Sequence, residues 1–437
     1  GLEARRFKTG TPPRVDGRTV DYGRLERQEG EEEGYRFSHW ENSGGLRRRP
    51  CWISRASDEV KEIVQENLGR SALYGGSIAS QGPRYCPSIE DKIVKFPDAA
   101  GHQVFLEPEG LETAELYVNG LSTSLPPDVQ RRFLAAVPGL ENARMTQAGY
   151  AIEYDYFPPL QLKRSLELKQ VDGLYLAGQV NGTTGYEEAA GQGLVAGINA
   201  ALDSLGREPW IPARDEAYLG VLIDDLVTRG VDEPYRLFTS RAEFRLLLRQ
   251  DNALARLGPI AASLGLLGND ETRRLNDHLE ELEGARAWVR QARVEPQSAN
   301  EWLTKRGTSP LTEKQPLDRL ARRPQVCLHE LVADEGPLED PGYGRDALAV
   351  VEMEIKYAGY IRREEERARV LADREHQPLP PDAPYAAFRS LSFEARQKLA
   401  AVKPETIGQA ARIPGVSPSD LQNLLVEVRR RLASNEP

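Results

Sequence analysis

Gly173-Leu-Tyr-Leu-Ala-Gly-Gln-Val-Asn-Gly-Thr-Thr-Gly-Tyr-Glu-Glu-Ala-Ala-Gly-Gln-Gly193 is the stretch that decides which fold this sequence encodes. Its apolar run 174–177 is short and bounded by glycines, which predicts a buried strand. Thr184 and Glu187 have the spacing of a capping box, so we expect a helix to begin near Gly185 or Tyr186. The order of strand, glycine-rich turn and helix is that of a crossover unit in an α/β fold.

The glycine-rich turn is a candidate ligand site. A helix N-terminus offers unpaired N–H groups and a partial positive charge, which suit an anionic or electron-rich ligand edge. Glycine and threonine are dense at the turn, where the backbone must approach something closely. Small residues at Ala189, Gly193, Gly197 and Ala200 predict a helix that packs closely on its sheet. An ordinary crossover without a ligand has the same spacing, so both interpretations stay open at this point.

Length and composition exclude several classes of protein. The chain has 437 residues, enough for two or three domains, and begins with Gly1 inside a plausible motif, so we expect a longer protein. No apolar run in these residues reaches membrane-span length, and we expect no signal peptide. The net charge of -10 disfavours a chain-wide nucleic-acid surface.

The cysteines and histidines indicate no metal centre. Three cysteines, Cys51, Cys86 and Cys327, are too few and too scattered for a disulfide framework or a zinc site. Free thiols are typical of a reducing cytosol, so we expect a cytoplasmic protein. None of the five histidines lies in a cluster with metal-ligand spacing, and we assign Cys51 and Cys327 structural roles.

Composition divides the chain into four regions. Residues 1–50 are rich in loops, and residues 51–165 mix turns with strand-like runs such as Gln103–Glu107 and Glu115–Val118. Residues 166–205 contain the opening motif. Beyond Gly206 the pattern is helical, with one interruption by a proline-bearing stretch.

A basic helix is predicted after the opening motif. Ser240 and Glu243 have capping-box spacing for a helix that reaches Gln250. Arginines at i, i+4 and i+8 would then follow one stripe, namely Arg241, Arg245 and Arg249. Arginine forks match phosphate oxygens, so a phosphate-binding role is reasonable. A solvated helix face with ion pairs explains the pattern equally well.

The stretch 411–418 resembles a tight turn between two short helices. Such units present backbone N–H groups to phosphates in some proteins. They also serve as ordinary connectors in helical domains, which the residues alone favour.

Cys86 is the candidate nucleophile. It lies in a loop between Arg84 and Lys92, and nearby positive charge raises the thiolate fraction of a cysteine. Two prolines restrict the loop and two carboxylates could carry protons, namely Pro83, Pro87, Glu90 and Asp91. A small buried structural cysteine is the alternative.

Together these motifs resemble those of the MnmG (GidA) family of flavoproteins. Seven runs carry the resemblance, in the order of the family and over nearly the whole chain: Lys8–Arg14, Gly82–Lys92, Phe105–Gly110, Gly149–Asp155, Gly178–Glu188, Glu233–Arg245 and Lys356–Ile361. The resemblance implies an α/β glutathione-reductase-like flavoprotein with an incomplete FAD domain and an inserted α/β domain, followed by an all-α C-terminal domain. It implies three ranges: an inserted domain with the NAD loop and the FAD-domain connections (1–165), the C-terminal part of the FAD domain (166–205), and a helical domain that binds tRNA and the partner (206–437).

The activity implied by the resemblance is tRNA modification. Enzymes of the family add a carboxymethylaminomethyl group to C5 of the anticodon wobble uridine, with FAD, NADH and a folate-derived one-carbon unit. The implied partners are tRNA and the GTPase MnmE in a heterotetramer, and the implied assembly is a homodimer without membrane contact. Uracil C5 is unreactive until a nucleophile adds to C6, a step that a loop thiolate can perform.

Site residues follow from the resemblance position by position. Cys86 matches the cysteine proposed as the nucleophile. The implied FAD residues are Gln179, Asn181, Gly182, Thr183 and Thr184. The implied NAD residues are Gly82, Pro83, Arg84, Tyr85, Cys86, Pro87, Ser88, Ile89, Glu90, Asp91, Lys92, Ile93, Val94, Lys95 and Phe96. Arg241, Arg245 and Arg249 fall in the region that faces tRNA, and we infer those contacts from charge.

The sequence departs from the family pattern in three places. The Gly-x-Gly-x-x-Gly fingerprint that cradles the FAD pyrophosphate is absent from these residues. A second family cysteine is absent as well. In Asp251–Arg256 the family aspartate after Asn-Ala is replaced by leucine.

Three other functions remain as alternatives. They are a non-catalytic fragment that binds tRNA or a partner, a folate- and FAD-dependent tRNA uridine methyltransferase, and a plain flavin–NADH oxidoreductase. The long helical region after Gly206 argues against the last two, because neither needs it.

Overall fold

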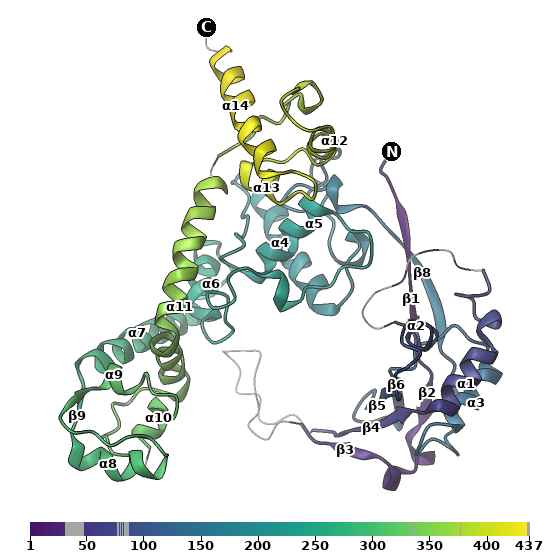
Figure 1. The fold of residues 1–437 in the computed structure, drawn as a ribbon, viewed down its shortest axis with the longest axis horizontal. Helices are drawn as coiled ribbons and strands as arrows, with labels where there is room; N and C mark the ends of the chain where they lie inside the picture. Colours follow the sequence, from purple (N-terminus) through teal and green to yellow (C-terminus); the bar gives the residue numbers. More distant parts are fainter. Residues whose placement is uncertain are drawn as a thin grey trace. The chain divides into compact units, whose positions relative to one another are not determined.

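The computed structural model of the chain describes residues 1–30, 48–76, 78, 80, 82, 87–333, 336–375 and 377–434. Two compact units result (Figure 1). The first unit consists of Gly1–Trp210 and Gly230–Leu237, and the second of Ile211–Arg229 and Phe238–Pro437. No helix in these described ranges has the length and apolar character needed to cross a membrane.

An antiparallel sheet forms the main body of the first unit. Its six strands run in the order β3-β4-β5-β6-β2-β7, with bounds β2 Arg14–Asp16, β3 Glu26–Gln28, β4 Cys51–Ala56, β5 His102–Pro108, β6 Glu115–Asn119 and β7 Met145–Gln147. The structure confirms both predicted strands, as β5 and β6. Three helices share a core with this sheet, namely α1 Asp58–Glu66, α2 Ile89–Lys95 and α3 Pro127–Ala135. Fully buried Val104, Leu106 and Phe133 belong to that core.

A separate two-stranded ribbon lies in the same unit. Its strands are β1 Arg5–Thr11 and β8 Tyr150–Tyr156, and they pair antiparallel from Arg5 opposite Tyr156 to Thr11 opposite Tyr150. The rings of Phe7 and Tyr156 stack with centroids 3.9 Å apart. The ribbon contacts the 3-10 turn η5 Gly178–Asn181, so it positions one side of the glycine-rich turn.

The prediction of a buried strand at 174–177 is wrong. Leu174 is 41% exposed, and Tyr175 forms only an isolated bridge, with Glu167. Gly173 and Gly178 have φ values of +74° and +81°, which end any extended run on both sides. The stretch is therefore one arm of a short irregular hairpin.

Helix α4, Tyr186–Ser204, begins where the sequence predicted. Its buried face carries Val195, Ile198 and Leu202. Gly193 and Gly197 face outward, and a Cβ added at either would meet no described atom within 4 Å. The prediction that the small-residue stripe packs on a sheet is therefore wrong for the described residues.

The second unit is helical. Its helices are α5 Tyr218–Arg229, α6 Ala253–Ser263, α7 Asn269–Gln291, α8 Pro296–Lys305, α9 Leu317–Leu320, α10 Leu328–Leu331, α11 Arg345–Glu375, α12 Phe393–Val402, α13 Ile407–Arg412 and α14 Pro418–Ser434, with the short strands β9 Arg293–Val294 and β10 Gln315–Pro316. Helices α7 and α11 pack together, and Leu282 shares a buried cluster with Ala347 and Val350. The predicted turn between α13 and α14 is confirmed, with Gly415 at φ +94°.

Candidate functional site

The turn between η5 and α4 depends on its glycines. Gly182 and Gly185 have φ values of +76° and +110°, a region that side chains other than glycine rarely adopt. A Cβ added at Gly182 would lie 2.7 Å from Cγ2 of Val231, and one at Gly185 would lie 2.0 Å from Oε2 of Glu188. The sequence therefore places glycine where neighbouring atoms leave no room for a side chain.

The capping box predicted for α4 does not form. Gly185 is the N-cap residue, and no side chain caps it. Thr184 instead donates its Oγ1 hydroxyl to the carbonyl oxygen of Tyr235 at 3.4 Å, and its backbone N–H to the same oxygen at 2.9 Å. The Thr184 hydroxyl is thus bonded to a segment distant in sequence, whereas the local pattern predicted that it would cap the helix.

A buried hydrogen-bond network holds the turn from inside. Asn181 donates its Nδ2 to Oε1 of Gln192 at 2.8 Å, and Gln192 donates its Nε2 to Oγ1 of Thr183 at 2.9 Å. The Thr183 hydroxyl then donates to the carbonyl oxygen of Gly178 at 3.0 Å. Asn181, Gly182 and Thr183 are buried, and the side chains of Asn181 and Thr183 shape the turn from within. Their assignment to FAD stays a prediction.

Gln179 and Thr184 are the two predicted FAD residues with accessible side chains. Gln179 is exposed and Thr184 half-buried. Near Gln179 lies the phenol of Tyr154, and burial raises the pKa of that hydroxyl to about 12. A ligand on the outer side of the turn would meet an amide, a hydroxyl and the N-terminus of α4.

Part of the predicted NAD loop lies outside the described residues. This applies to Pro83, Arg84, Tyr85 and the candidate nucleophile Cys86. Of the remaining positions, Gly82 and Pro87 are half-buried. Ser88 is the N-cap of α2, where its Oγ accepts the backbone N–H of Asp91 at 3.1 Å.

Much of α2 serves the core of the first unit. Ile89 and Ile93 are buried against the sheet. Glu90 is fully buried, and its Oε1 accepts a hydrogen bond from the Ser71 hydroxyl at 3.1 Å and one from the Ser124 backbone N–H at 2.9 Å. Its Oε2 has no hydrogen-bond partner among the described atoms.

The end of α2 and the residue after it are the exposed part of this stretch. Val94, Lys95 and Phe96 are exposed, whereas Lys92 donates its Nζ to the carbonyl oxygen of Gly120 at 2.9 Å. The NAD assignment of this stretch stays a prediction.

The predicted basic helix from Ser240 to Gln250 is wrong. Only a 3-10 turn, η6 Thr239–Arg241, forms there. Glu243, which was expected to cap the helix, instead accepts hydrogen bonds from Nη2 of Arg214. Leu246 donates its backbone N–H to Oε2 of Glu364 on α11 at 3.0 Å. Tertiary partners have therefore replaced the bonds that a helix needs.

The three arginines of this segment lie in different environments. Arg249 is largely buried, with its Nε 3.0 Å from Asp251 and its Nη1 2.7 Å from the carbonyl oxygen of Leu246. Arg241 is partly exposed and lies 3.7 Å from Asp225. Arg245 is exposed. These arginines form no common stripe, and Arg245 is the one best placed to meet a phosphate.

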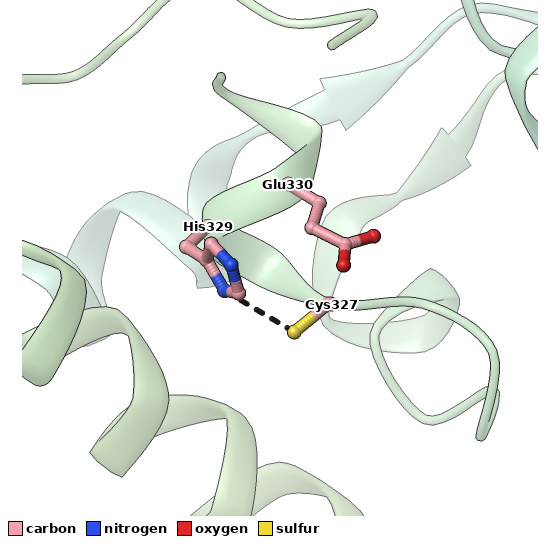
Figure 2. Close-up of side chains that lie close together, drawn as sticks. All are labelled: Cys327, His329 and Glu330. Carbon is pink, nitrogen blue, oxygen red and sulfur yellow. Dashed lines mark hydrogen bonds between the residues drawn. The ribbon is translucent and has the colours of Figure 1, made fainter. Parts of the chain in front are cut away.

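A cluster that sequence reasoning missed lies at the start of α10 (Figure 2). One ligand-type atom each from Cys327, His329 and Glu330 lies within 4.8 Å of the others, and Sγ of Cys327 is 3.2 Å from Nδ1 of His329. The Cys-x-His-Glu spacing was its only signal in the sequence.

The neighbours of this cluster are protein side chains. Burial, together with Glu352, raises the pKa of the Cys327 thiol to about 11. Arg306 also pairs with Glu330 at 3.0 Å. We therefore interpret the cluster as a hydrogen-bonded element of the second unit.

Comparison with known proteins covers nearly the whole chain. A family profile described as "Glucose inhibited division protein A" matches residues 1–208. The profiles "tRNA modifying enzyme MnmG/GidA C-terminal helical domain" and "tRNA modifying enzyme MnmG/GidA C-terminal helical bundle" match residues 269–365 and 367–436.

Curated relatives with the name "tRNA uridine 5-carboxymethylaminomethyl modification enzyme MnmG" match nearly the whole chain, and two of them illustrate the similarity. The one from Flavobacterium psychrophilum is 48% identical over 434 residues, which are 98% of this chain and 70% of the relative. The one from Salinibacter ruber is 46% identical over 98% of this chain and 65% of the relative.

Solved structures of GidA from Aquifex aeolicus match with a TM-score of 0.84. The form I crystal is 45% identical and the form II crystal 43%, and each comparison covers 98% of this chain and 69% or 68% of the solved chain. These matches confirm the expected fold class, an α/β flavoprotein-type region followed by a helical C-terminal region. The chain belongs to the MnmG/GidA family.

Proposed function

We propose that the chain acts in tRNA modification, as part of the FAD- and NADH-dependent addition of a carboxymethylaminomethyl group to C5 of the anticodon wobble uridine. The observation that carries this proposal is the turn from Gly178 to Glu188. Its sequence is one of the seven runs that resemble the family, and its outer side combines a helix N-terminus with the exposed amide of Gln179. Family membership of nearly the whole chain supports the same activity.

The residues of the turn fit a flavin. Gly182 and Gly185 allow the positive φ values that the turn needs, and a Cβ at either position would collide with Val231 or Glu188. Helix α4 has 19 residues, and its first N–H groups have no partner within the helix. Gln179 would contact the flavin, and Asn181 and Thr183 would fix the turn beneath it. When bound, FAD supplies the redox chemistry of the reaction.

Cys86 is the proposed nucleophile. Addition of a thiolate to uracil C6 generates the enolate whose C5 attacks an electrophilic carbon. A base then removes the C5 proton, and elimination of the thiolate from C6 restores the C5–C6 double bond. NADH is the proposed reductant, bound by the stretch 82–96.

The second unit is the proposed contact region for RNA. Arg245 is exposed, and guanidinium groups bind phosphate oxygens bidentately. We further propose the GTPase MnmE as partner in a heterotetramer, a homodimer as the assembly and the cytoplasm as the location. We propose three domain ranges. Residues 1–165 form the inserted α/β domain with the NAD loop and the FAD-domain connections, residues 166–205 the C-terminal part of the FAD domain, and residues 206–437 the helical domain that binds tRNA and the partner.

Two measurements test the proposal. Cells that lack the wobble modification are complemented with the gene that encodes this chain, and their tRNA nucleosides are analysed by mass spectrometry. Restored carboxymethylaminomethyluridine is the expected result. Ribothymidine would instead support the methyltransferase alternative, and no change in the nucleosides would contradict the proposed activity.

Flavin binding is measured separately on the purified chain. We expect FAD absorbance to be retained after gel filtration and to fall in Gln179→Ala. Gln291→Ala, a change at an exposed glutamine of α7, is the matched control and should leave flavin retention unaltered. A colourless wild-type protein after incubation with excess FAD would favour the alternative of a non-catalytic fragment that binds tRNA or a partner.

A further inference from the structure

The segment 230–237 lies against the glycine-rich turn. Three hydrogen bonds of 2.9 Å join them: from Tyr235 N to Gly182 O, from Thr184 N to Tyr235 O and from Leu237 N to Oε1 of Glu188. Thr183 and Tyr235 also form a parallel bridge. This eight-residue segment therefore supplies hydrogen-bond partners to the turn from outside.

Buried carboxylates precede this segment. Helix α5 ends at Arg229, and within it Asp224 and Asp225 are 2% and 1% exposed. Nη1 of Arg214 lies 3.0 Å from Oδ2 of Asp224 and 2.8 Å from Oδ1 of Asp225. Buried charges of this kind persist in proteins when they are paired and hydrogen-bonded.

The same guanidinium also holds the residues that follow the segment. Nη2 of Arg214 lies 2.8 Å from Oε1 of Glu243 and donates to the carbonyl oxygen of Arg241 at 3.3 Å. Arg241 in turn lies 3.7 Å from Oδ2 of Asp225. The residues before the segment 230–237 and the residues after it are thus linked by one cluster of ion pairs.

A third arginine brings the C-terminal helices to this cluster. Arg412, the last residue of α13, forms a bidentate pair with Asp224, with its Nε 2.6 Å from Oδ2 and its Nη2 2.7 Å from Oδ1. The tight turn before α14 follows immediately. Asp224 therefore contacts arginines that are far apart in sequence.

We propose that Asp224 and Asp225 are positioning residues for the glycine-rich turn. By pairing with Arg214 they close the base of the loop formed by 230–237. A loop with fixed ends has fewer accessible conformations, so Tyr235 and Leu237 stay in place against the turn. Arg412 connects the C-terminal helices to the same base. The importance of this coupling for catalysis rests on the proposed function, but the coupling itself requires neither flavin nor RNA.

Hydrogen exchange at single amides tests the inference. In Asp225→Asn we expect the amides of Thr184, Tyr235 and Leu237 to exchange at least tenfold faster than in the wild type, while the amide of Val104 in β5 keeps its rate. Faster exchange confined to these three amides distinguishes positioning from a general loss of stability. Unchanged exchange at all three would overturn the proposal.

Arg286→Met is the matched control. This arginine forms a bidentate pair of similar length with Glu354, at 2.8 and 2.6 Å, in the same unit. If Arg286→Met accelerates the three amides as much as Asp225→Asn does, the effect is not specific and the proposal fails.

Two further variants keep the test decisive. If Asp225→Asn fails to fold, Glu243→Gln is the substitute, because it weakens the ion pair of the same cluster with Arg214 at a partly exposed residue. The same three amides should then exchange at least threefold faster. Arg412→Met should accelerate them if the C-terminal helices take part, and Arg412→Lys should restore part of the protection. The readout needs no substrate, so an inactive wild-type chain would refute the proposed function and leave this test intact.

Discussion

The glycine-rich turn and the arginine-bearing segment begin with the same local signal and end in different structures. Thr184 and Glu187 have capping-box spacing, as do Ser240 and Glu243. Neither pair forms a capping box. After the first, a helix of 19 residues follows, whereas after the second only a 3-10 turn of three residues forms.

The difference lies in what each segment can bury. Helix α4 has a continuous buried face with Val195, Ile198 and Leu202, and tertiary packing of such a face supplies most helical stability. In the second segment, Glu243 accepts a hydrogen bond from Arg214, and the backbone N–H of Leu246 donates to Glu364. Charge-assisted bonds to a buried arginine compete successfully with a single turn of helix. A capping signal is therefore informative only where an apolar face continues behind it.

The largest expected effect is the loss of stability when the buried ion pairs beside the arginine-bearing segment are broken. Arg214→Met leaves Asp224 and Asp225 without their shared guanidinium, and breaking a buried pair by removing one partner costs about 3–5 kcal/mol. We expect urea denaturation to show a loss of free energy of unfolding in that range. Arg273→Met removes an exposed pair with Asp270 and should change it by less than about 1 kcal/mol. Equal effects of both variants would mean that the buried cluster contributes no more than a surface pair.

The next effect is on the turn. Gly185→Ala introduces a Cβ 2.0 Å from Oε2 of Glu188 at a φ of +110°, and such strain costs about 1–3 kcal/mol. Gly193→Ala lies on the outward face of α4, where a Cβ meets no described atom within 4 Å, so it should stabilise the helix by about 0.5–1 kcal/mol. Thermal unfolding should move in opposite directions for the two variants. A fall in melting temperature for Gly193→Ala would show that the outward face is covered.

Two arginines of the arginine-bearing segment should differ in their effect on RNA binding. Arg245→Ala should reduce the salt dependence of tRNA binding by about one phosphate contact, because this side chain is exposed. Arg249→Ala removes a buried bond to Leu246 and should lower stability with the salt slope unchanged. Filter binding at several salt concentrations gives both slopes. If only Arg249→Ala reduced the salt dependence of tRNA binding, the phosphate contact would belong to Arg249 and not to Arg245.

The smallest effect concerns Tyr154 beside the turn. Its pKa is raised to about 12 by burial, above the value of about 10 for a free tyrosine. A raised pKa in the folded state means that the neutral hydroxyl favours folding below pH 10 and that this contribution is lost as the pH rises toward 12. Burial also raises the pKa of Tyr385 to about 12, so ultraviolet titration should show one tyrosine fewer near pH 12 in Tyr154→Phe than in the wild type. Titration of all tyrosines near pH 10 would contradict the burial of this phenol.

Local spacing predicted the features that depend on neighbouring residues. The start of α4, the strands β5 and β6 and the turn before α14 follow from periodicity and glycine positions. The predicted buried strand at 174–177 was wrong because glycines with positive φ bound this run on both sides. The bond from Leu237 to Glu188 spans 49 residues and that from Arg412 to Asp224 spans 188, so no local pattern contains them. Motif resemblance identified the family, whereas the inward orientation of Asn181 and Thr183 required the structure.

The discontinuous course of the first unit determines where the chain can be cut. A fragment that ends at Trp210 lacks Gly230–Leu237, although this segment belongs to the same unit. Such a fragment leaves the carbonyl of Gly182 and the carboxylate of Glu188 without the donors that Tyr235 and Leu237 supply. A soluble fragment of this unit therefore needs the eight residues added back, as a fused extension or as a peptide in trans.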